Sequence, residues 1–548
     1  MKRNKSWFLL MIMLLTIVLI GCYGGDVDDN QNTDRKSTDV AQEMTLVSGG
    51  EIATMDSLGG YDVTSSTAMN AVFEGLHIIG PGDEILPGIA KSYEISDDQL
   101  TYTFKLREDA VWSNDDPVTA HDFVYAWQKA IHPDTAGVFS YLMLDIKNAY
   151  KIQTEGDALY GKSEELGVTA LDDHTLQVVL EYQVPYFHGL VVAPVFYPLN
   201  KEFVEAQGEN YALDINSMLY NGAFIMDSWK QGEGWSFKKN EKYWDADNVK
   251  MEKVTVKIVK EAGTSLNLYE AGEIDTVTIS SENIDLYKDS AEFSTSEKPT
   301  IYFMRYNHTN EFLKNENVRK AIDMGWNKQD MVDVILKNGS VSAHYLVPAG
   351  FAKDQNGKDF REYNGNFNEF NKEEALALWN KGKEELGIEK ATVEILSYDS
   401  GSSKTIVEYM KNQLETNLPG LTISINMQPS KQKLALSASM DFDMDFGGWA
   451  PDYQDAFTFL EIFTTDSYYN QSAYSDPKFD ELIAKSRVTA DATERWNILL
   501  EAEKILMEKA TIGPIYQVGS ARITKPNLKG LTEHSFSIDM SYRWAYKE

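Results

Sequence analysis

Histidine and cysteine, the usual ligands of a protein-bound zinc ion, are few and poorly spaced in this chain of 548 residues. The eight histidines are His77, His121, His132, His174, His188, His308, His344 and His534. None of them forms an H-x-x-x-H or H-E-x-x-H pattern, which would place two ligands on one helix face. The sequence therefore gives no support for a metal site.

Carboxylates are abundant, and residues 441–445 (DFDMD) alternate them with apolar side chains. This run lacks the glycine and the terminal glutamate of an EF-hand calcium loop. Its alternation is typical of a strand with Phe442, Met444 and Phe446 facing inward. A pair of carboxylates can also hydrolyse a glycosidic bond, and the sequence neither supports nor excludes such a pair.

Motifs of nucleophilic catalysis and phosphate binding are absent from the sequence. It contains no G-x-S-x-G elbow, no Walker A loop and no G-x-G-x-x-G fingerprint. We predict no catalytic residue and no cofactor, and we interpret the chain as a binding protein that is not an enzyme.

Cys22 is the only cysteine in the chain, and it follows a segment typical of a secretory signal peptide. The positive start MKRNK precedes residues 7–20, an apolar stretch shorter than the roughly 20 residues of a membrane-spanning helix. The residues LIGC at 19–22 resemble the bacterial lipobox, whose cysteine becomes lipidated. We expect 1–21 to be a lipoprotein signal peptide and Cys22 to hold the mature chain on the extracytoplasmic face of the cell membrane. An uncleaved signal anchor is the alternative.

Residues 22–44 are polar and poor in large apolar side chains, so they cannot build a core. We predict a flexible tether there, which would reach about 25 Å from the membrane. The net charge of the whole chain is −33. A nucleic-acid-binding protein needs a basic face, so this charge argues against nucleic acid as a partner.

Strands and helices that could position a binding site are readable from periodicity. Leu100, Tyr102, Phe104 and Leu106 alternate with polar residues, which predicts a half-buried strand. The same pattern recurs at Leu176, Val178 and Leu180, and at Val254, Val256 and Ile258. Phe123, Trp127, Ala130 and Ile131 fall on one face of a helix that we expect to begin after Thr119. A late amphipathic helix is predicted around Trp496, Leu499, Glu503 and Leu506.

A βαβ crossover is predicted between residues 392 and 427. Residues 392–398 read as a strand, 403–418 as a helix and 421–427 as a second strand, with Pro419 and Gly420 at the last junction. Such a crossover joins parallel strands. Because the earlier segments resemble hairpins, we expect mixed α/β architecture with more than one sheet.

Short motifs in a fixed order extend over some 500 residues. They are NAVFEGL at 70–76, PGIA at 87–90, TYTFKLREDAVWS at 101–113, PVTAHDFVY at 117–125, NGAF at 221–224, YW at 243–244, AGEID at 271–275, VRKAI at 318–322 and GWAPDY at 448–453. In this order they resemble the oligopeptide-binding proteins of extracytoplasmic solute-binding protein family 5, which serve peptide and nickel ABC importers. Most of the motifs are expected to be turns and packing positions.

The resemblance implies a two-lobed, periplasmic-binding-protein-like α/β fold of the Venus flytrap type, with mixed sheets and an extra domain on the first lobe. Lobe I would combine residues 45–73, 198–299 and 520–548. An accessory domain II would span 74–197, and lobe III would span 300–519. A hinge would let the two lobes close over a ligand.

The resemblance also implies a way to bind peptides of many sequences. An extended peptide would pair with protein backbone at Val63, Thr64 and Ser65 and at Gly448, Trp449 and Ala450, as an added strand. Asp452 would pair with the α-ammonium group of the peptide, with Trp449 as a pocket wall and Tyr141 as a further contact. A capping or surface acid is the alternative for Asp452, and a core position is the alternative for Trp449.

Some positions depart from the enteric relatives. Two arginines that help to hold a short peptide by its carboxylate correspond to Ser437 and Phe446, and a tryptophan corresponds to Ser430. Arg305 and Lys404 are candidates to replace the arginines, although a solvated role is an equal alternative for each. We therefore expect an apolar cleft with little restriction on peptide length.

Capture of oligopeptides for the transmembrane permease of an ABC transporter is the function that the sequence favours, with the receptor acting as a monomer. A receptor for a hydrophobic signalling peptide, such as a pheromone, would use the same importer. A secreted cell-surface hydrolase is an alternative of a different class, and nickel or a sugar is an alternative ligand within the fold.

Overall fold

The computed structural model describes residues 40–59, 62–135 and 137–548. The predicted signal peptide, Cys22 and most of the predicted tether lie outside the described residues. The described chain groups into one unit from Ala41 to Glu548. The first strand begins at Glu43, and its Met44 is buried, so the last two residues of the predicted tether belong to the folded structure.

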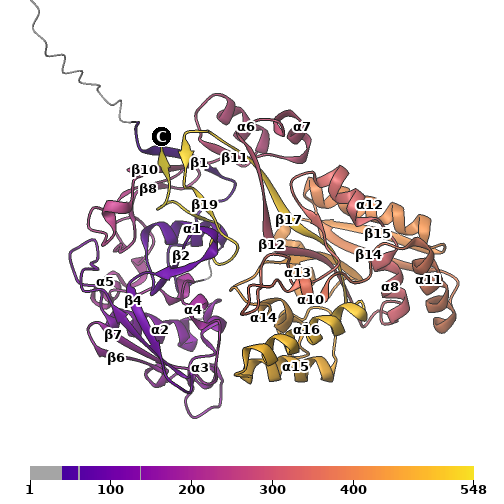
Figure 1. The fold of residues 1–548 in the computed structure, drawn as a ribbon, viewed down its shortest axis with the longest axis horizontal. Coiled ribbons are helices and arrows are strands. Elements are labelled where there is room, and N and C mark those ends of the chain that lie inside the picture. Colours follow the sequence, from indigo (N-terminus) through magenta and orange to yellow (C-terminus); the bar gives the residue numbers. More distant parts are fainter. Residues whose placement is uncertain (1–39, 60–61, 136) are drawn as a thin grey trace, which may run out of the picture. The chain divides into compact units, whose positions relative to one another are not determined.

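Three main sheets organise the fold (Figure 1). The first has the order β1 (Glu43–Ser48), β10 (Lys253–Ile258), β9 (Gly234–Lys239) and β8 (Phe224–Lys230). The second has the order β4 (Ala90–Ile95), β5 (Thr101–Leu106), β7 (Thr175–Val179) and β6 (Val168–Asp172). The third has the order β11 (Thr276–Thr278), β17 (Ile512–Thr524), β12 (Phe293–Tyr306), β16 (Met444–Trp449), β14 (Ala391–Tyr398) and β15 (Leu421–Gln428), with β13 (Val341–Ser342) beside β17.

Short strand pairs and helices complete the structure. The strand pairs are β2 (His77–Ile79) with β3 (Ile85–Pro87), β18 (Leu528–Lys529) with β21 (Tyr546–Lys547), and β19 (Thr532–Glu533) with β20 (Met540–Ser541). The helices up to residue 300 are α1 (Val63–Val72), α2 (Ala120–Ile131), α3 (Ala149–Gln153), α4 (Phe187–Leu190), α5 (Lys201–Gln207), α6 (Ala262–Glu270) and α7 (Ile284–Tyr287). The later ones are α8 (Glu316–Met324), α9 (Lys328–Met331), α10 (Arg361–Asn364), α11 (Lys372–Leu386), α12 (Gly401–Asn417), α13 (Ser430–Ala438), α14 (Phe457–Leu460), α15 (Pro477–Val488) and α16 (Ala492–Glu508).

The strands and helices expected from periodicity are confirmed. Tyr102, Phe104 and Leu106 of β5 are buried, as are Leu176 and Val178 of β7 and Val254 and Val256 of β10. Helix α2 begins after Thr119 because Thr119 and Asp122 form a capping box, which satisfies amides of the first turn. Glu503 of α16 is fully buried and forms an ion pair with Arg361, so this position of the predicted helix holds a buried acid.

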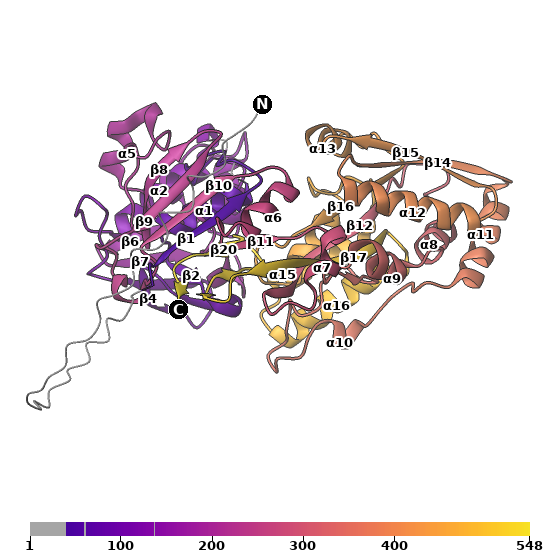
Figure 2. The same ribbon diagram turned by 90° about the horizontal axis from the view of Figure 1, so that it is seen from above.

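The predicted βαβ crossover is confirmed as β14–α12–β15. β14 and β15 pair in parallel along their whole lengths, from Ala391 with Leu421 to Tyr398 with Gln428. Helix α12 lies along both strands (Figure 2), with Ile406, Val407, Met410 and Leu414 buried. The sheet is mixed, because β16 runs parallel to β14 and antiparallel to β12.

The two long strands β12 and β17 join the parts of the chain that the family resemblance assigns to different lobes. They pair antiparallel, with a register irregularity between Glu297 and Ile301. The predicted lobe boundaries at residues 299/300 and 519/520 fall inside these strands. A strand pair that crosses both boundaries is the natural place for a hinge.

Several of the short sequence motifs meet at one buried carboxylate, that of Glu74. Trp244 donates its indole N–H to Glu74 at 2.7 Å, Tyr243 donates its hydroxyl, and Arg543 forms an ion pair at 3.0 Å. Asn221 accepts from the Glu74 amide at 3.0 Å and donates to its carbonyl at 2.9 Å. These contacts confirm that the motifs around residues 74, 221 and 243–244 are packing positions.

Candidate functional site

Asp452 lies three residues after Trp449, the last residue of β16, where strand pairing stops. Pro451 precedes it and has no amide hydrogen to continue a ladder. The Asp452 amide donates instead to Thr458 Oγ1 at 3.3 Å. The strand, the proline and this turn together hold the carboxylate of Asp452 at the end of the third sheet.

The carboxylate of Asp452 is half-buried and has few polar partners. Burial raises its pKa to about 6, although a hydrogen bond from the Tyr141 hydroxyl opposes this shift. Burial of the Tyr141 hydroxyl raises its pKa far above the usual value, and the negative charge of Asp452 raises it further. Tyr141 therefore keeps its proton and can donate a hydrogen bond. The structure therefore brings together two of the residues singled out from the sequence.

Aromatic rings surround Tyr141 and Asp452. Tyr469 makes edge-to-face contacts with Trp449 at 4.9 Å and with Tyr141 at 6.2 Å between ring centroids. Tyr468 contacts Tyr469 in the same way at 5.3 Å. Trp449 thus has a pocket-wall position, as predicted, and its indole N–H is buried without an acceptor among the described residues.

These rings enclose a cavity of about 330 Å³, which we call the acidic cavity. Its walls include Tyr141, Asp145, Trp449, Asp452, Glu461, Asp466, Tyr469 and Arg487. Most of the remaining wall is aliphatic or aromatic, as expected for an apolar cleft, but the carboxylates of Asp145, Glu461 and Asp466 were not expected beside that of Asp452.

The acids of this cavity are held by neighbouring polar groups. Glu461 forms an ion pair with Arg487 at 2.9 Å and accepts from the Tyr453 hydroxyl at 2.5 Å. Burial raises the pKa of Glu461 to about 7, against the effect of Arg487. Asp145 accepts from the hydroxyls of Tyr182 and Tyr186, and burial raises its pKa. Protonation near neutral pH is therefore available to more than one wall acid.

A second cavity of about 370 Å³, the central cavity, is also lined by Asp452. Its walls include Asp62, Val63, Lys298, Thr300, Ala450 and Asp452. Asp452 lines both cavities, so a group held by its carboxylate would face both. The structure thus brings Val63, Ala450 and Asp452, which the family resemblance assigns to the peptide, around one space.

The backbone at Val63, Thr64 and Ser65 differs from the extended segment that strand pairing requires. These residues form the first turn of α1, and Asp62 caps the helix by accepting from the Ser65 amide at 2.8 Å. The Ser65 hydroxyl accepts from the Ala53 amide at 2.9 Å, a structural role. Amides at the start of a helix lack intrahelical acceptors, so the predicted backbone contact with a peptide would have to come from this first turn.

The backbone at Gly448, Trp449 and Ala450 keeps the geometry expected for strand addition. β16 pairs with β12 from Met444 to Trp449, but with β14 only at Met444 and Asp445. Within the described chain, residues 446–449 therefore have a paired strand on one side only. An edge of this kind can accept an extended peptide.

Arg305 and Lys404 are not brought to either cavity. The guanidinium of Arg305 is buried and forms an ion pair with Asp445 at 2.6 Å, and Asp445 also pairs with Lys433 at 2.8 Å. Lys404 is exposed on α12 and lies 3.9 Å from Glu408, one helical turn away. Neither residue is on the walls of the two cavities, so the structure adds no support for either as a ligand contact.

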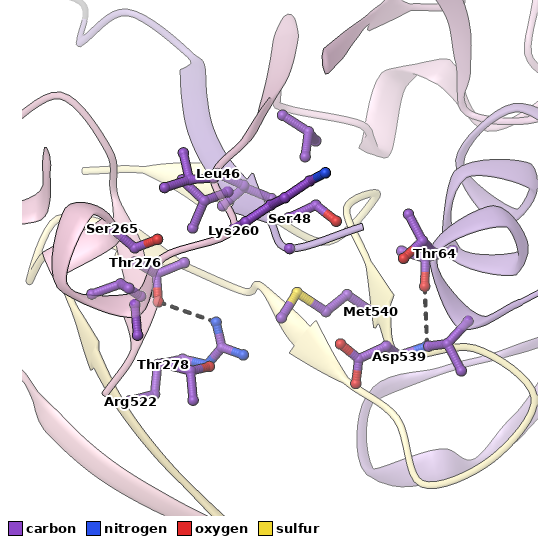
Figure 3. A pocket seen from close by; sticks show the side chains of 18 of the residues that line it. Leu46, Ser48, Thr64, Lys260, Ser265, Thr276, Thr278, Arg522, Asp539 and Met540 are labelled. Carbon is purple, nitrogen blue, oxygen red and sulfur yellow. Dashed lines mark hydrogen bonds between the residues drawn. The ribbon is translucent and has the colours of Figure 1, made fainter. Parts of the chain in front are cut away.

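A third cavity, of about 490 Å³, lies elsewhere (Figure 3). It is formed by β1, β10, β11, α1 and α6, with Lys260, Arg522 and Asp539 on its walls. Arg522 donates to Thr276 Oγ1 at 3.4 Å and pairs with Glu533 at 2.6 Å. Its walls are rich in hydroxyl groups and include the aromatic rings of Trp235 and Tyr542, but Asp452 is not among them.

Sequence reasoning missed Asp145, Glu461 and Tyr469. They lie in segments without regular periodicity, and their approach to Asp452 depends on contacts such as the stacking of Tyr186 on Tyr453 at 4.5 Å. In the part of the chain that the structure describes, no cluster of three metal-ligating side chains occurs. Among the same residues, no helix has the length and hydropathy to cross a bilayer.

The chain is similar to known proteins along nearly its whole length. Residues 84–471 match the family model described as bacterial extracellular solute-binding proteins, family 5 middle. The dipeptide-binding protein DppE of Bacillus subtilis is 30% identical over 555 residues, covering 100% of both chains.

Solved structures agree with the sequence comparisons. The substrate-binding domain of an oligopeptide ABC transporter from Bacillus anthracis is 40% identical, with a TM-score of 0.80, and covers 92% of this chain and 99% of its own. The pheromone receptor PrgZ is 32% identical with a TM-score of 0.81, covering 93% and 100%. These likenesses confirm the expected two-lobed α/β fold with mixed sheets. The chain belongs to family 5 of the bacterial extracellular solute-binding proteins.

Proposed function

We propose that this protein is an extracytoplasmic receptor that captures extended oligopeptides between its lobes and delivers them to an ABC transporter permease. The half-buried carboxylate of Asp452, placed where two cavities meet and beside the one-sided edge of β16, carries this proposal. An ammonium group can pair with the carboxylate while main-chain groups pair with the edge. Main-chain pairing explains tolerance of sequence, because every peptide offers the same N–H and C=O groups.

The proposal includes lipid anchoring at Cys22 after removal of residues 1–21, a monomeric state and the three-part division of the chain. The lipobox-like LIGC and the polar residues 22–44 support the anchor. A tethered receptor can meet a permease in the same membrane. The order of the sheets along the chain supports the division into lobes I and III with an accessory domain II.

Uptake of a signalling peptide is a second candidate. The likeness to the pheromone receptor PrgZ over 93% of this chain favours it. The mostly apolar wall of the acidic cavity also fits a hydrophobic peptide. A nutrient receptor should bind unrelated peptides with similar affinity, whereas a signalling receptor should prefer one sequence strongly.

Incubation with defined peptides separates a receptor from a hydrolase. Peptides of three to eight residues are mixed in large molar excess with purified protein and analysed by chromatography over hours, with a separate calorimetric titration giving the stoichiometry. A receptor binds one intact peptide per chain. Cleavage of many peptide molecules per protein molecule would contradict the proposal.

Acidification should weaken binding of a peptide with a free amino group. Pairing needs the ionised form of Asp452, and burial raises the pKa of this carboxyl to about 6, whereas the α-ammonium remains protonated below about pH 7.7. Affinity should therefore be nearly constant from pH 7.5 to 7 and about tenfold lower at pH 5. Calorimetry across this range measures the effect, and a pH-independent affinity would rule out an ionised Asp452 as the partner.

A further inference from the structure

The acidic cavity carries more negative charge than a ligand's amino terminus can neutralise. Among the residues that line it, four are acidic and one is basic. The acids are Asp145, Asp452, Glu461 and Asp466, and the base is Arg487. An α-ammonium on Asp452 would still leave an excess of two negative charges when all four acids are ionised. Charge in a partly desolvated space is costly unless it is paired.

The partners of each acid show where this excess lies. Arg487 lies against Glu461 at 2.9 Å, so it accounts for one charge. Asp145 is 9% exposed and accepts only from tyrosine hydroxyls, with no ion pair among the described side chains. Asp466 is exposed at the cavity wall and forms no hydrogen bond or ion pair within the described chain. Asp145 and Asp466 are therefore the wall acids without a direct ion pair, although the charges of Arg487 and Arg495 lower the pKa of Asp145 against the effect of burial.

The aromatic walls of the same cavity are a second, independent feature that suits a cation. Trp449, Tyr141 and Tyr468 all pack edge-to-face around Tyr469. Rings arranged around a space present electron-rich faces, and such cages bind ammonium and guanidinium groups. An aliphatic wall would hold an apolar side chain equally well but would give nothing to a cation.

The position of Asp452 connects this cavity to the first residue of a ligand. A peptide whose ammonium pairs with Asp452 has its main chain beside Ala450 and the central cavity. Because Asp452 also lines the acidic cavity, the first side chain is the one adjacent to the rings and to Asp145.

We propose that the acidic cavity is a specificity pocket for the first side chain of the ligand and selects lysine or arginine there. This inference rests on the proposed function, since it assumes that the amino terminus lies at Asp452. A basic side chain would stack its stem on Tyr469 and Trp449 and place its charge near Asp145 and Asp466. An acidic first residue would be repelled by the same walls.

The test compares tripeptides X-Ala-Ala in which X is Lys, Arg, norleucine or Glu. Norleucine matches the lysine stem without its charge, so the ratio of the two affinities isolates the effect of the cation. Calorimetry on the purified protein at pH 7.5 should give at least tenfold tighter binding for Lys and Arg than for norleucine, and weakest binding for Glu.

Variants locate the effect. Asp466→Asn, on an exposed side chain that is safe for folding, should reduce the lysine-to-norleucine ratio about threefold, and Asp145→Asn should reduce it further. Glu481→Gln removes the same charge from an exposed site of α15 outside the cavity and should leave the ratio unchanged. Equal affinity for lysine and norleucine peptides would overturn the specificity pocket while leaving the receptor in place. Failure of all four peptides to bind would overturn both.

Discussion

Replacing Asp452 with asparagine should weaken binding of a peptide with a free amino terminus by two to three orders of magnitude. Loss of one partner from a desolvated ion pair leaves the other charge unpaired, at a cost of about 3–5 kcal/mol. Asparagine keeps the size of the side chain and its hydrogen bonding to Tyr141, so the effect reports charge. Calorimetry with one peptide on both proteins measures it.

The control for this variant is the same peptide with an acetylated amino group. The acetylated peptide should bind weakly to the native protein, and Asp452→Asn should change its affinity by less than about threefold. Asp441→Asn removes an exposed acid from the same part of the chain and should change neither affinity. If the free and acetylated peptides lost affinity equally in Asp452→Asn, the carboxylate would be acting on the fold and not on the ammonium group.

Replacing Asp445 with asparagine should lower the free energy of unfolding by about 3–5 kcal/mol. Asp445 is fully buried between two buried cations, Arg305 at 2.6 Å and Lys433 at 2.8 Å. A neutral side chain would leave both cations without a counter-charge. Burial already lowers the pKa of Lys433, so loss of its proton at high pH should relieve part of the cost, and the deficit should be larger at low pH.

Urea denaturation of both proteins at pH 6 and pH 9 measures this effect, with Glu408→Gln as the matched control. Glu408 pairs with Lys404 at 3.9 Å, and both side chains are more than half exposed. An exposed pair contributes little, so the control should lose less than about 0.5 kcal/mol. A similarly small loss of unfolding free energy in Asp445→Asn would contradict this prediction. It would show that groups other than Asp445 neutralise the charges of Arg305 and Lys433.

Local patterns explain why much of the fold could be predicted. Alternation of apolar residues specifies which face of a strand is buried, and Tyr102, Phe104 and Leu106 needed no tertiary information. The β14–α12–β15 crossover was readable because Pro419 and Gly420 separate its helix from its second strand. Glu74 shows the limit of such reading, because its motif was recognised but its partners Tyr243 and Arg543 lie far along the chain.

The residues of the candidate site could be predicted where a sequence motif marks them. They could not be predicted where contacts between distant segments bring them to the site. Asp452 and Trp449 were singled out because the motif GWAPDY at 448–453 resembles the family, and Trp449 is the last residue of β16. Arg305 was misjudged because its partner Asp445 lies on a neighbouring strand, and only strand register brings the two together. The acids of the acidic cavity were missed because Asp145 and Glu461 come from segments more than 300 residues apart.

Native mass spectrometry of the protein, purified without denaturation, tests the central claim most directly. If the protein binds peptides between its lobes through their main chain, some purified molecules should retain a bound peptide. The spectrum should then show a mixture of ligand masses, with one ligand per protein molecule. These ligands should fragment as unmodified peptides of several residues. Bound masses that fragment as a sugar or another non-peptide compound would contradict the account, as would a protein that stays unbound when peptides are supplied in excess.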